Sequence, residues 1–219
     1  MAITASCAVR TVLASVTLEV ADLGVARRFY DVFGVGAYIR LRASGADSAG
    51  FRGFTLALTV SGPATVDGFV AAAVGAGATV LKPAVKSLWG YGGVVRAPDG
   101  TVWKVATSAK KDTGPATGEI DEFVLLLGVQ DVKATKQFYV DRGLVVAKNF
   151  GGKYAEFASG QSSPVKLALY KHRALAKDLG VPADGTGSHR IVLGGAVEAF
   201  TDPDGFVWEC VAPSSPAQS

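Results

Sequence analysis

The residue types that most often carry chemistry are scarce in this chain, which holds two histidines and two cysteines among 219 residues. His172, in YKHRALAK, is expected to be a solvated residue at a helix start, and His189, before RIVLG, could face either a cleft or solvent. Cys7 and Cys210 lack the spacing of a C-x-x-C pair, so they predict no disulfide scaffold and favour a reduced, cytoplasmic location. Cys210 itself is expected to be a buried, inert thiol.

Charge and hydropathy argue against two classes of partner. The formal net charge is +3, and the densest basic run is Lys110-Lys111, so no clustered basic patch favours nucleic-acid binding. No stretch approaches the ~18 apolar residues that a membrane span needs. Arg10 interrupts the first apolar segment, which therefore does not predict a signal peptide. We expect neither a nucleic-acid nor a membrane partner.

The elements that must position any site come from an internal repeat. Residues 20–34, VADLGVARRFYDVFG, resemble residues 129–143, VQDVKATKQFYVDRG. The identical pairs at constant offset are Val20/Val129, Asp22/Asp131, Phe29/Phe138, Tyr30/Tyr139 and Gly34/Gly143. Each copy predicts a strand, an aspartate N-cap, a helix with inward aromatics and a glycine stop.

A second repeated motif closes each half. PDGTVWK begins at Pro98 and PDGFVWE begins at Pro203, and each predicts a turn followed by a strand that carries a tryptophan. The Gly- and Pro-rich segment 108–119 is expected to be a linker between a first module, 1–107, and a second, 120–213, with a disordered tail at 214–219.

The halves are not complete copies. The first contains a helix pattern at 65–76 and a strand near 79–82, whereas the second predicts nothing comparable between Ile191 and Asp202. The second half instead carries an excursion at 170–187, with a short helix expected at 173–179.

The order of these motifs, used twice, resembles the vicinal oxygen chelate superfamily of glyoxalase, bleomycin-resistance and extradiol-dioxygenase relatives. The strongest local matches are VADLGVARRFYDVFG, the segment from GFTLALTV to WGYGG, and TDPDGFVWECV. The resemblance covers nearly the whole chain. It implies an α+β fold in which two tandem βαβββ modules pair into a curved, mostly antiparallel eight-stranded sheet around a cleft. Both a monomer and a homodimer stay open, because two modules in one chain can complete a cleft that single-module relatives complete as dimers.

The resemblance also implies four positions for a divalent metal ion, and the residues there suit one poorly. The first-strand positions fall at Ser15 and near Val124, with Glu122 two residues away, and the closing strands supply Lys104 and Glu209. A divalent ion needs three or more N, O or S donors from the protein. Only Glu209 is a good ligand, so we expect neither a bound metal nor another cofactor.

By the same resemblance, Lys104 and Glu209 occupy equivalent positions facing the cleft. They could form an ion pair that shapes the cleft or orients a ligand, although such a pair stabilises little because desolvation offsets the attraction. Glu19 lies on the same face of the predicted first strand as Ser15 and Thr17, so it could join this ion pair. Glu209 could equally be a partly exposed strand carboxylate, and no catalytic residue is assigned.

Aromatic residues are the other candidates for ligand contact. Trp89 and Tyr91 lie in a Gly-rich hairpin, LWGYGG, where Trp89 could line a ligand site or close the edge of the core. Trp103 and Trp208 alternate away from the cleft positions and are expected to pack under helices.

Three functions are compatible with these residues. The first is metal-free binding of a small hydrophobic or aromatic molecule, for which aromatic residues are available: Tyr38, Phe51, Phe54, Trp89, Tyr91 and Tyr154. The second is a metal-dependent lyase, isomerase or dioxygenase with an atypical ligand set such as Glu122, His189 and Glu209. The third is a scaffold or interaction protein whose cleft is filled by its own side chains.

Overall fold

The computed structural model describes residues 11–112, 114–160 and 163–210. Cys7 and the tail predicted at 214–219 lie outside these ranges. The helices are α1 (Leu23–Phe33), α2 (Pro63–Gly75), α3 (Val132–Asp141), α4 (His172–Leu179) and a 3₁₀ turn, η1 (Gly36–Tyr38). Within the described ranges, no helix has the length and apolar character to cross a membrane.

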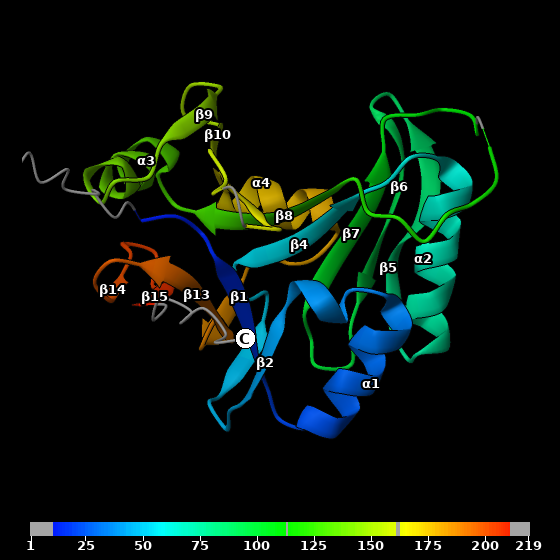
Figure 1. Ribbon diagram of the computed structural model, residues 1–219, viewed down its shortest axis with the longest axis horizontal. Helices are drawn as coiled ribbons and strands as arrows, with labels where there is room; N and C mark the ends of the chain where they lie inside the picture. Colours follow the sequence, from blue (N-terminus) through cyan, green and yellow to red (C-terminus); the bar gives the residue numbers. More distant parts are fainter. Residues whose placement is uncertain (1–10, 113, 161–162, 211–219) are drawn as a thin grey trace, which may run out of the picture.

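The larger sheet has eight strands in the order β5-β6-β7-β4-β8-β11-β10-β9 (Figure 1). Its strands are β4 (Phe54–Thr59), β5 (Thr79–Ser87), β6 (Gly90–Arg96), β7 (Val102–Thr107), β8 (Glu122–Val129), β9 (Val146–Asn149), β10 (Tyr154–Phe157) and β11 (Lys166–Lys171). The antiparallel pair β4–β8 joins the two halves of the chain at the centre of this sheet.

A smaller sheet has five strands in the order β14-β15-β13-β1-β2. Its strands are β1 (Ser15–Val20), β2 (Arg40–Ala43), β13 (Ile191–Ala196), β14 (Phe200–Thr201) and β15 (Val207–Cys210). Here the antiparallel pair β1–β13 joins the halves. Strands β3 (Ser48–Gly50) and β12 (Gly185–Gly187) form a two-stranded ribbon.

The predicted α+β class and mostly antiparallel pairing are confirmed. The structure adds that the eight-stranded sheet comes from the inner part of the chain, 54–171, and that the outer parts form a separate five-stranded sheet. Each sheet therefore contains strands from both halves, so neither half builds a complete sheet alone. Segment 108–119, predicted as a linker, lies between β7 and β8.

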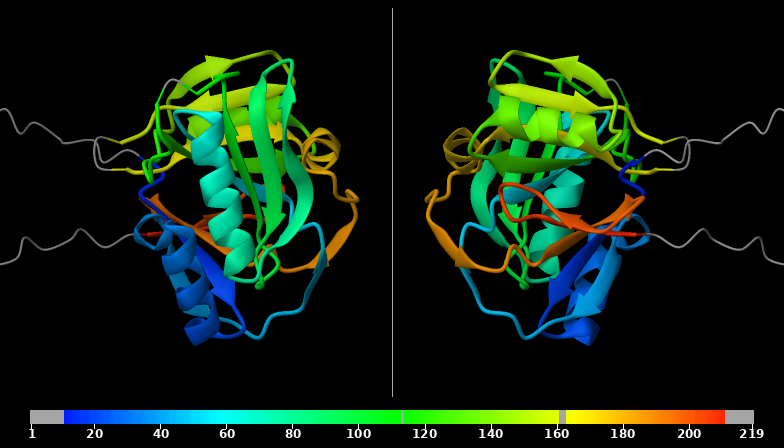
Figure 2. Two further views of the ribbon diagram at one scale, coloured as in Figure 1. Left: turned by 90° about the vertical axis from the view of Figure 1, so that its right-hand side faces the viewer. Right: turned by 90° about the vertical axis from the view of Figure 1, so that its left-hand side faces the viewer.

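The helices cover opposite faces of the larger sheet. Figure 2 shows α2 on one side of β5–β7 and α4 on the other. The α2 side belongs to the main core, in which Trp103 is fully buried against Tyr30, Phe33 and Phe123. A smaller apolar cluster joins α4 to the opposite face, through Leu175, Ala176 and Leu179 against Val94, Val102, Leu126 and Tyr170.

The helix boundaries follow the sequence pattern. The helices predicted at 65–76 and 173–179 are present as α2 and α4, and in the described chain no helix lies between Ile191 and Asp202. Asp22 accepts a hydrogen bond from the amide of Val25, and Asp131 accepts from the amides of Lys133 and Ala134, so both are N-caps.

The two repeated motifs bind to each other within each half. The Tyr30 hydroxyl donates to Asp99 of the first Pro-Asp-Gly turn at 2.6 Å. The Tyr139 hydroxyl donates at 2.6 Å to Asp202, next to the second such turn. Asp202 is 5% exposed, whereas Asp99 is half-buried, so the second contact is the more desolvated. In each half, therefore, a tyrosine hydroxyl joins the FY helix to the closing turn.

We expect Tyr139→Phe to lower the free energy of unfolding by about 2 kcal/mol at neutral pH, because it leaves a buried carboxylate oxygen without its donor. Burial raises the pKa of Asp202, and the hydrogen bonds from Tyr139 and the amide of Phe206 oppose this rise only in part. Because the pKa of Asp202 is higher in the folded protein than in the unfolded chain, protonation of Asp202 favours the folded state. This stabilisation is fully present below the unfolded-state pKa and is lost as the pH rises through the folded-state pKa. The cost of Tyr139→Phe should therefore shrink as the pH is lowered from neutral to about 4, because a larger fraction of Asp202 is then protonated and uncharged.

Urea denaturation of wild type, Tyr139→Phe and Tyr30→Phe at both pH values measures this effect. Tyr30→Phe is the matched control, and its loss should be smaller because Asp99 is less buried. Equal losses for the two variants, or a loss that does not depend on pH, would contradict the prediction.

Candidate functional site

The face of the eight-stranded sheet that carries α4, here called the concave face, holds one row of chemically distinct side chains. Lys166, Val124, Ala57 and Lys104 are register partners on the adjacent strands β11, β8, β4 and β7. In Figure 1 the sheet curves from β5 through β4 and β8 to β9, with α4 between its two ends. The row therefore places a lysine on each side of an apolar floor.

Both lysines of this row are paired with carboxylates. The Lys104 ammonium lies 2.6 Å from Asp178 of α4, and the Lys166 ammonium lies 2.5 Å from Glu122 of β8. All four side chains are 32–45% exposed, so each pair is screened by solvent and contributes little to stability. Their main effect is to position charge at the open part of the concave face.

A cavity of about 310 Å³ lies on this face, between the β5–β6 hairpin and the end of α4. Its apolar lining comes from Pro83, Val85, Trp89, Val94 and Ala106. Gly92 leaves part of the lining without a side chain. The volume is near the lower end of the roughly 300–1,000 Å³ typical of small-molecule sites.

Backbone geometry brings the hairpin close to β7. Gly90 has φ of 136°, and a Cβ there would lie 2.0 Å from the carbonyl oxygen of Thr107. Only glycine fits this approach. The neighbouring Trp89 is 85% exposed and borders the cavity, so it does not close the core edge. Tyr91 also borders the cavity, but its hydroxyl donates to Asp67 of α2 at 2.8 Å and is directed to that helix.

The other predicted site residues lie together on the five-stranded sheet. One face of β1 carries Ser15, Thr17 and Glu19. Gly194 of β13 lies between the two outer strands, since it is the register partner of Ser15 on β1 and of Glu209 on β15. Arg42 of β2 contacts both carboxylates, at 2.8 Å from Glu19 and 2.9 Å from Glu209. These hydrogen bonds, the one to Glu209 foremost, raise the pKa of the Arg42 guanidinium.

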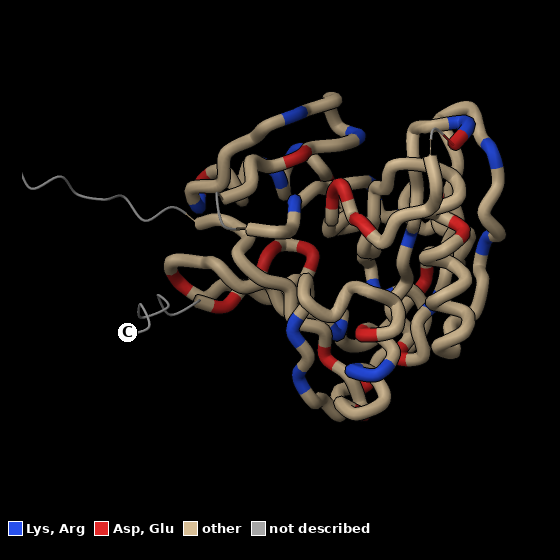
Figure 3. Tube along the Cα trace, turned by 45° about the vertical axis from the view of Figure 1, so that its right-hand side comes forward, with Lys and Arg blue, Asp and Glu red and all other residues tan. Residues whose placement is uncertain are grey.

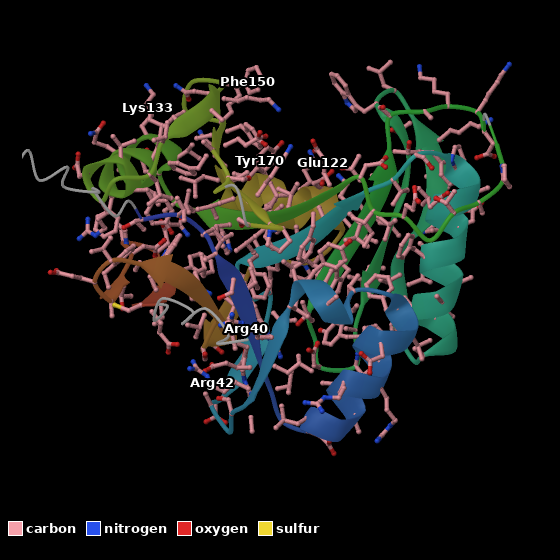
Figure 4. All side chains as sticks on the ribbon, in the orientation of Figure 1. Arg40, Arg42, Glu122, Lys133, Phe150 and Tyr170 are labelled. Carbon is pink, nitrogen blue, oxygen red and sulfur yellow. The ribbon has the colours of Figure 1, made fainter. Side chains whose placement is uncertain are left out.

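Lys104 and Glu209 do not form the ion pair that the resemblance allowed. The two residues lie on different sheets, and their partners are Asp178 and Arg42. Figure 4 shows the two sheets, with Arg40 and Arg42 labelled on β2 of the smaller sheet and Glu122 and Tyr170 labelled on the larger sheet. Two residues at matching positions of a repeat need not touch each other in the fold, and here they lie on different sheets.

Neither set suits a divalent metal ion. On the smaller sheet the Arg42 guanidinium occupies the space between the two carboxylates and would repel a cation. On the larger sheet Lys104 and Val124 offer no ligand, and Glu122 is paired with Lys166. In the ranges that the structure describes, no cluster of three or more His, Cys, Asp or Glu residues could hold a metal ion.

Both histidines are tethered to backbone carbonyl groups. The nitrogens of His172 lie 3.3 Å and 2.8 Å from the carbonyl oxygens of Gly128 and Ala183, so this residue is not the solvated one expected. The nitrogens of His189 lie 2.7 Å and 3.0 Å from those of Arg52 and Asp204. These contacts join loops to strands and leave the imidazoles engaged in structure.

One cysteine expectation is also corrected. Cys210, the last residue of β15, is exposed rather than buried, and it forms no disulfide with any of the described residues. Trp103 and Trp208, in contrast, are fully buried, as expected.

Three functional candidates escaped the sequence reasoning: Arg42, Lys82 and Asp178. Arg42 belongs to a short, mostly exposed strand, and Asp178 lies in the excursion at 170–187, for which the sequence predicts only a short helix. No local motif marks any of them. The distribution of charge does not identify these residues either, because basic and acidic residues are intermixed along the trace (Figure 3).

Comparison with known proteins supports the fold. No protein-family model matches the sequence, and no curated protein matches it significantly. Among solved structures, glyoxalase I from Zea mays aligns with 92% of this chain and 92% of its own, at 14% identity and a TM-score of 0.55. A putative dioxygenase from Bacillus subtilis covers 92% of this chain and 85% of its own, at 10% identity and the same TM-score of 0.55. The chain therefore shares the overall fold of these two proteins, as the resemblance of its motifs implied, and fold does not decide function.

Proposed function

We propose that this protein binds a small, mainly apolar molecule in the cavity beside the β5–β6 hairpin, without a bound metal ion. One observation carries the proposal: an apolar cavity lies on the concave face and is lined in part by Lys104, at a position where the resemblance implies a metal ligand. Trp89, whose ring is exposed to water, would gain buried area against a planar ligand. We place this activity in the cytoplasm, and we leave monomer and homodimer as alternatives.

An NMR titration of ¹⁵N-labelled protein with 2-naphthol tests the proposal. We expect saturable shifts of the amides of Gly90 and Gly92 and of the Trp89 indole N–H, because these groups border the cavity. The buried indoles of Trp103 and Trp208 are internal controls and should not move. If 2-naphthol shifts none of the cavity signals, and indole and quinoline also fail, this cavity is not a binding site for planar apolar molecules.

Metal independence has its own expected result. After exhaustive chelation, addition of Zn²⁺, Mn²⁺, Ni²⁺ or Fe²⁺ should neither raise the melting temperature nor alter 2-naphthol binding. The reason is that Glu19 and Glu209 already bind Arg42, and Glu122 already binds Lys166. A concentration-dependent rise that Glu209→Ala abolishes would show that a metal site exists and that the proposal is wrong.

A second candidate function rests on α4. This helix covers part of the concave face with Leu175, Ala176 and Leu179, which favours a scaffold whose cleft is filled by its own side chains. The same titration separates the two functions. Saturable shifts at the hairpin support the binder, whereas an unresponsive hairpin with all planar probes supports the scaffold.

A further inference from the structure

The polar groups of the cavity are concentrated where it meets the last turn of α4. Lys104 donates to the carboxylate of Asp178 at 2.6 Å. The Lys82 ammonium donates to the main-chain carbonyls of Lys177 and Asp178, so it stabilises the negative end of the helix dipole. The cavity therefore combines an apolar wall with two ammonium groups and one side-chain carboxylate.

These two lysines differ in what they can offer a ligand. Lys82 is committed to two helix carbonyls, which α4 needs at its C-terminal end. Within the described residues, the Lys104 ammonium donates to Asp178. An ammonium has three N–H donors, so Lys104 can still donate to a ligand. Its strand neighbours on this face, Ala57 and Val94, have apolar side chains that accept no hydrogen bond.

The charged groups that line the cavity favour one class of ligand. An amine entering this cavity would meet two ammonium groups against a single carboxylate that is already paired. A carboxylate would instead meet the remaining donors of Lys104 and would offset the excess positive charge. The apolar wall and the exposed indole of Trp89 suit a planar ring at the other end of the same molecule.

We propose that the ligand of this cavity is a planar aromatic molecule with one carboxylate, which binds Lys104 while its ring packs against Trp89. This inference rests on the proposed function, since it names the ligand class of the same cavity. Asp178 competes with the ligand carboxylate for Lys104 and thereby moderates its affinity. Because Lys104 is about one-third exposed, the carboxylate contribution is partly screened and should weaken with added salt.

Isothermal titration calorimetry with three matched probes tests this assignment: naphthalene-2-carboxylate, naphthalene-2-carboxamide and 2-naphthylmethylamine. The wild-type protein should bind the carboxylate about tenfold more tightly than the amide, as one charge-assisted hydrogen bond implies, and the amine most weakly. Lys104→Met should abolish the preference for the carboxylate over the amide, because it removes the cationic donor. Lys104→Arg, which keeps the charge, should retain the preference.

The variant Asp178→Asn gives a second test of the ligand assignment. It should tighten carboxylate binding several-fold and weaken amine binding, because it removes the competing anion. Thermal melts of each variant show whether it is folded before it is titrated. Equal affinity of wild-type protein for all three probes, or a carboxylate preference that survives Lys104→Met, would overturn the ligand class while the binding proposal survives. Binding of none of the three probes would overturn both.

Discussion

Replacement of Leu179 by alanine is expected to lower the free energy of unfolding by about 2–5 kcal/mol, the range for truncating a fully buried leucine in a core. Leu179 is fully buried at the last residue of α4 and packs in the small cluster that attaches this helix to the concave face. The cluster contains few residues, so the cavity left by the missing atoms cannot be refilled by neighbours without shifting the helix itself.

Urea denaturation of wild type, Leu179→Ala and Arg173→Ala measures this effect. Arg173 is exposed on the same helix, and its replacement should change stability by no more than about 0.5 kcal/mol. A loss below about 1 kcal/mol for Leu179→Ala would mean that α4 is not packed against the larger sheet in solution. The concave face would then be more open than the structure shows.

Replacement of Ala106 by phenylalanine should reduce the affinity for 2-naphthol or naphthalene-2-carboxylate at least a hundredfold. Ala106 is half-buried on β7, lines the cavity and is the register partner of Gly92 on β6. The phenyl ring added to the β-carbon of residue 106 would project over this glycine and occupy space that the ligand ring needs. A hundredfold loss corresponds to about 2.7 kcal/mol of binding free energy.

Calorimetry of Ala106→Phe beside Ala134→Phe provides the matched comparison. Ala134 is exposed on α3, away from the cavity lining, so the same chemical change there should leave affinity unchanged. Melting curves confirm that both variants fold. Unchanged affinity in a folded Ala106→Phe protein would place the ligand elsewhere and refute the assignment of this cavity.

Much of the local structure follows from the sequence alone. The caps at Asp22 and Asp131, the helices α2 and α4 and the buried Trp103 were predicted from patterns that span a few residues. Such features depend on backbone hydrogen bonds and side-chain periodicity within one element, which local sequence specifies.

The candidate site was predicted only in part. Trp89 and Lys104 do border one cavity, but Ser15, Thr17 and Glu209 belong to another sheet. The sequence offered no way to choose the partner of each charged residue, because an ion pair depends on strand order and on side chains distant along the chain. Asp178 lies 74 residues from Lys104, and Glu209 lies 167 residues from Arg42.

The sequence by itself determined the repeated units and the α+β class. Tertiary structure decided how those units combine: β1 pairs with β13 and β4 pairs with β8. These four strands are all short apolar segments, so the sequence pattern does not discriminate among their possible partners. Only the packing of the whole chain selects one arrangement, and that arrangement brings Arg42 between two carboxylates and α4 onto the concave face.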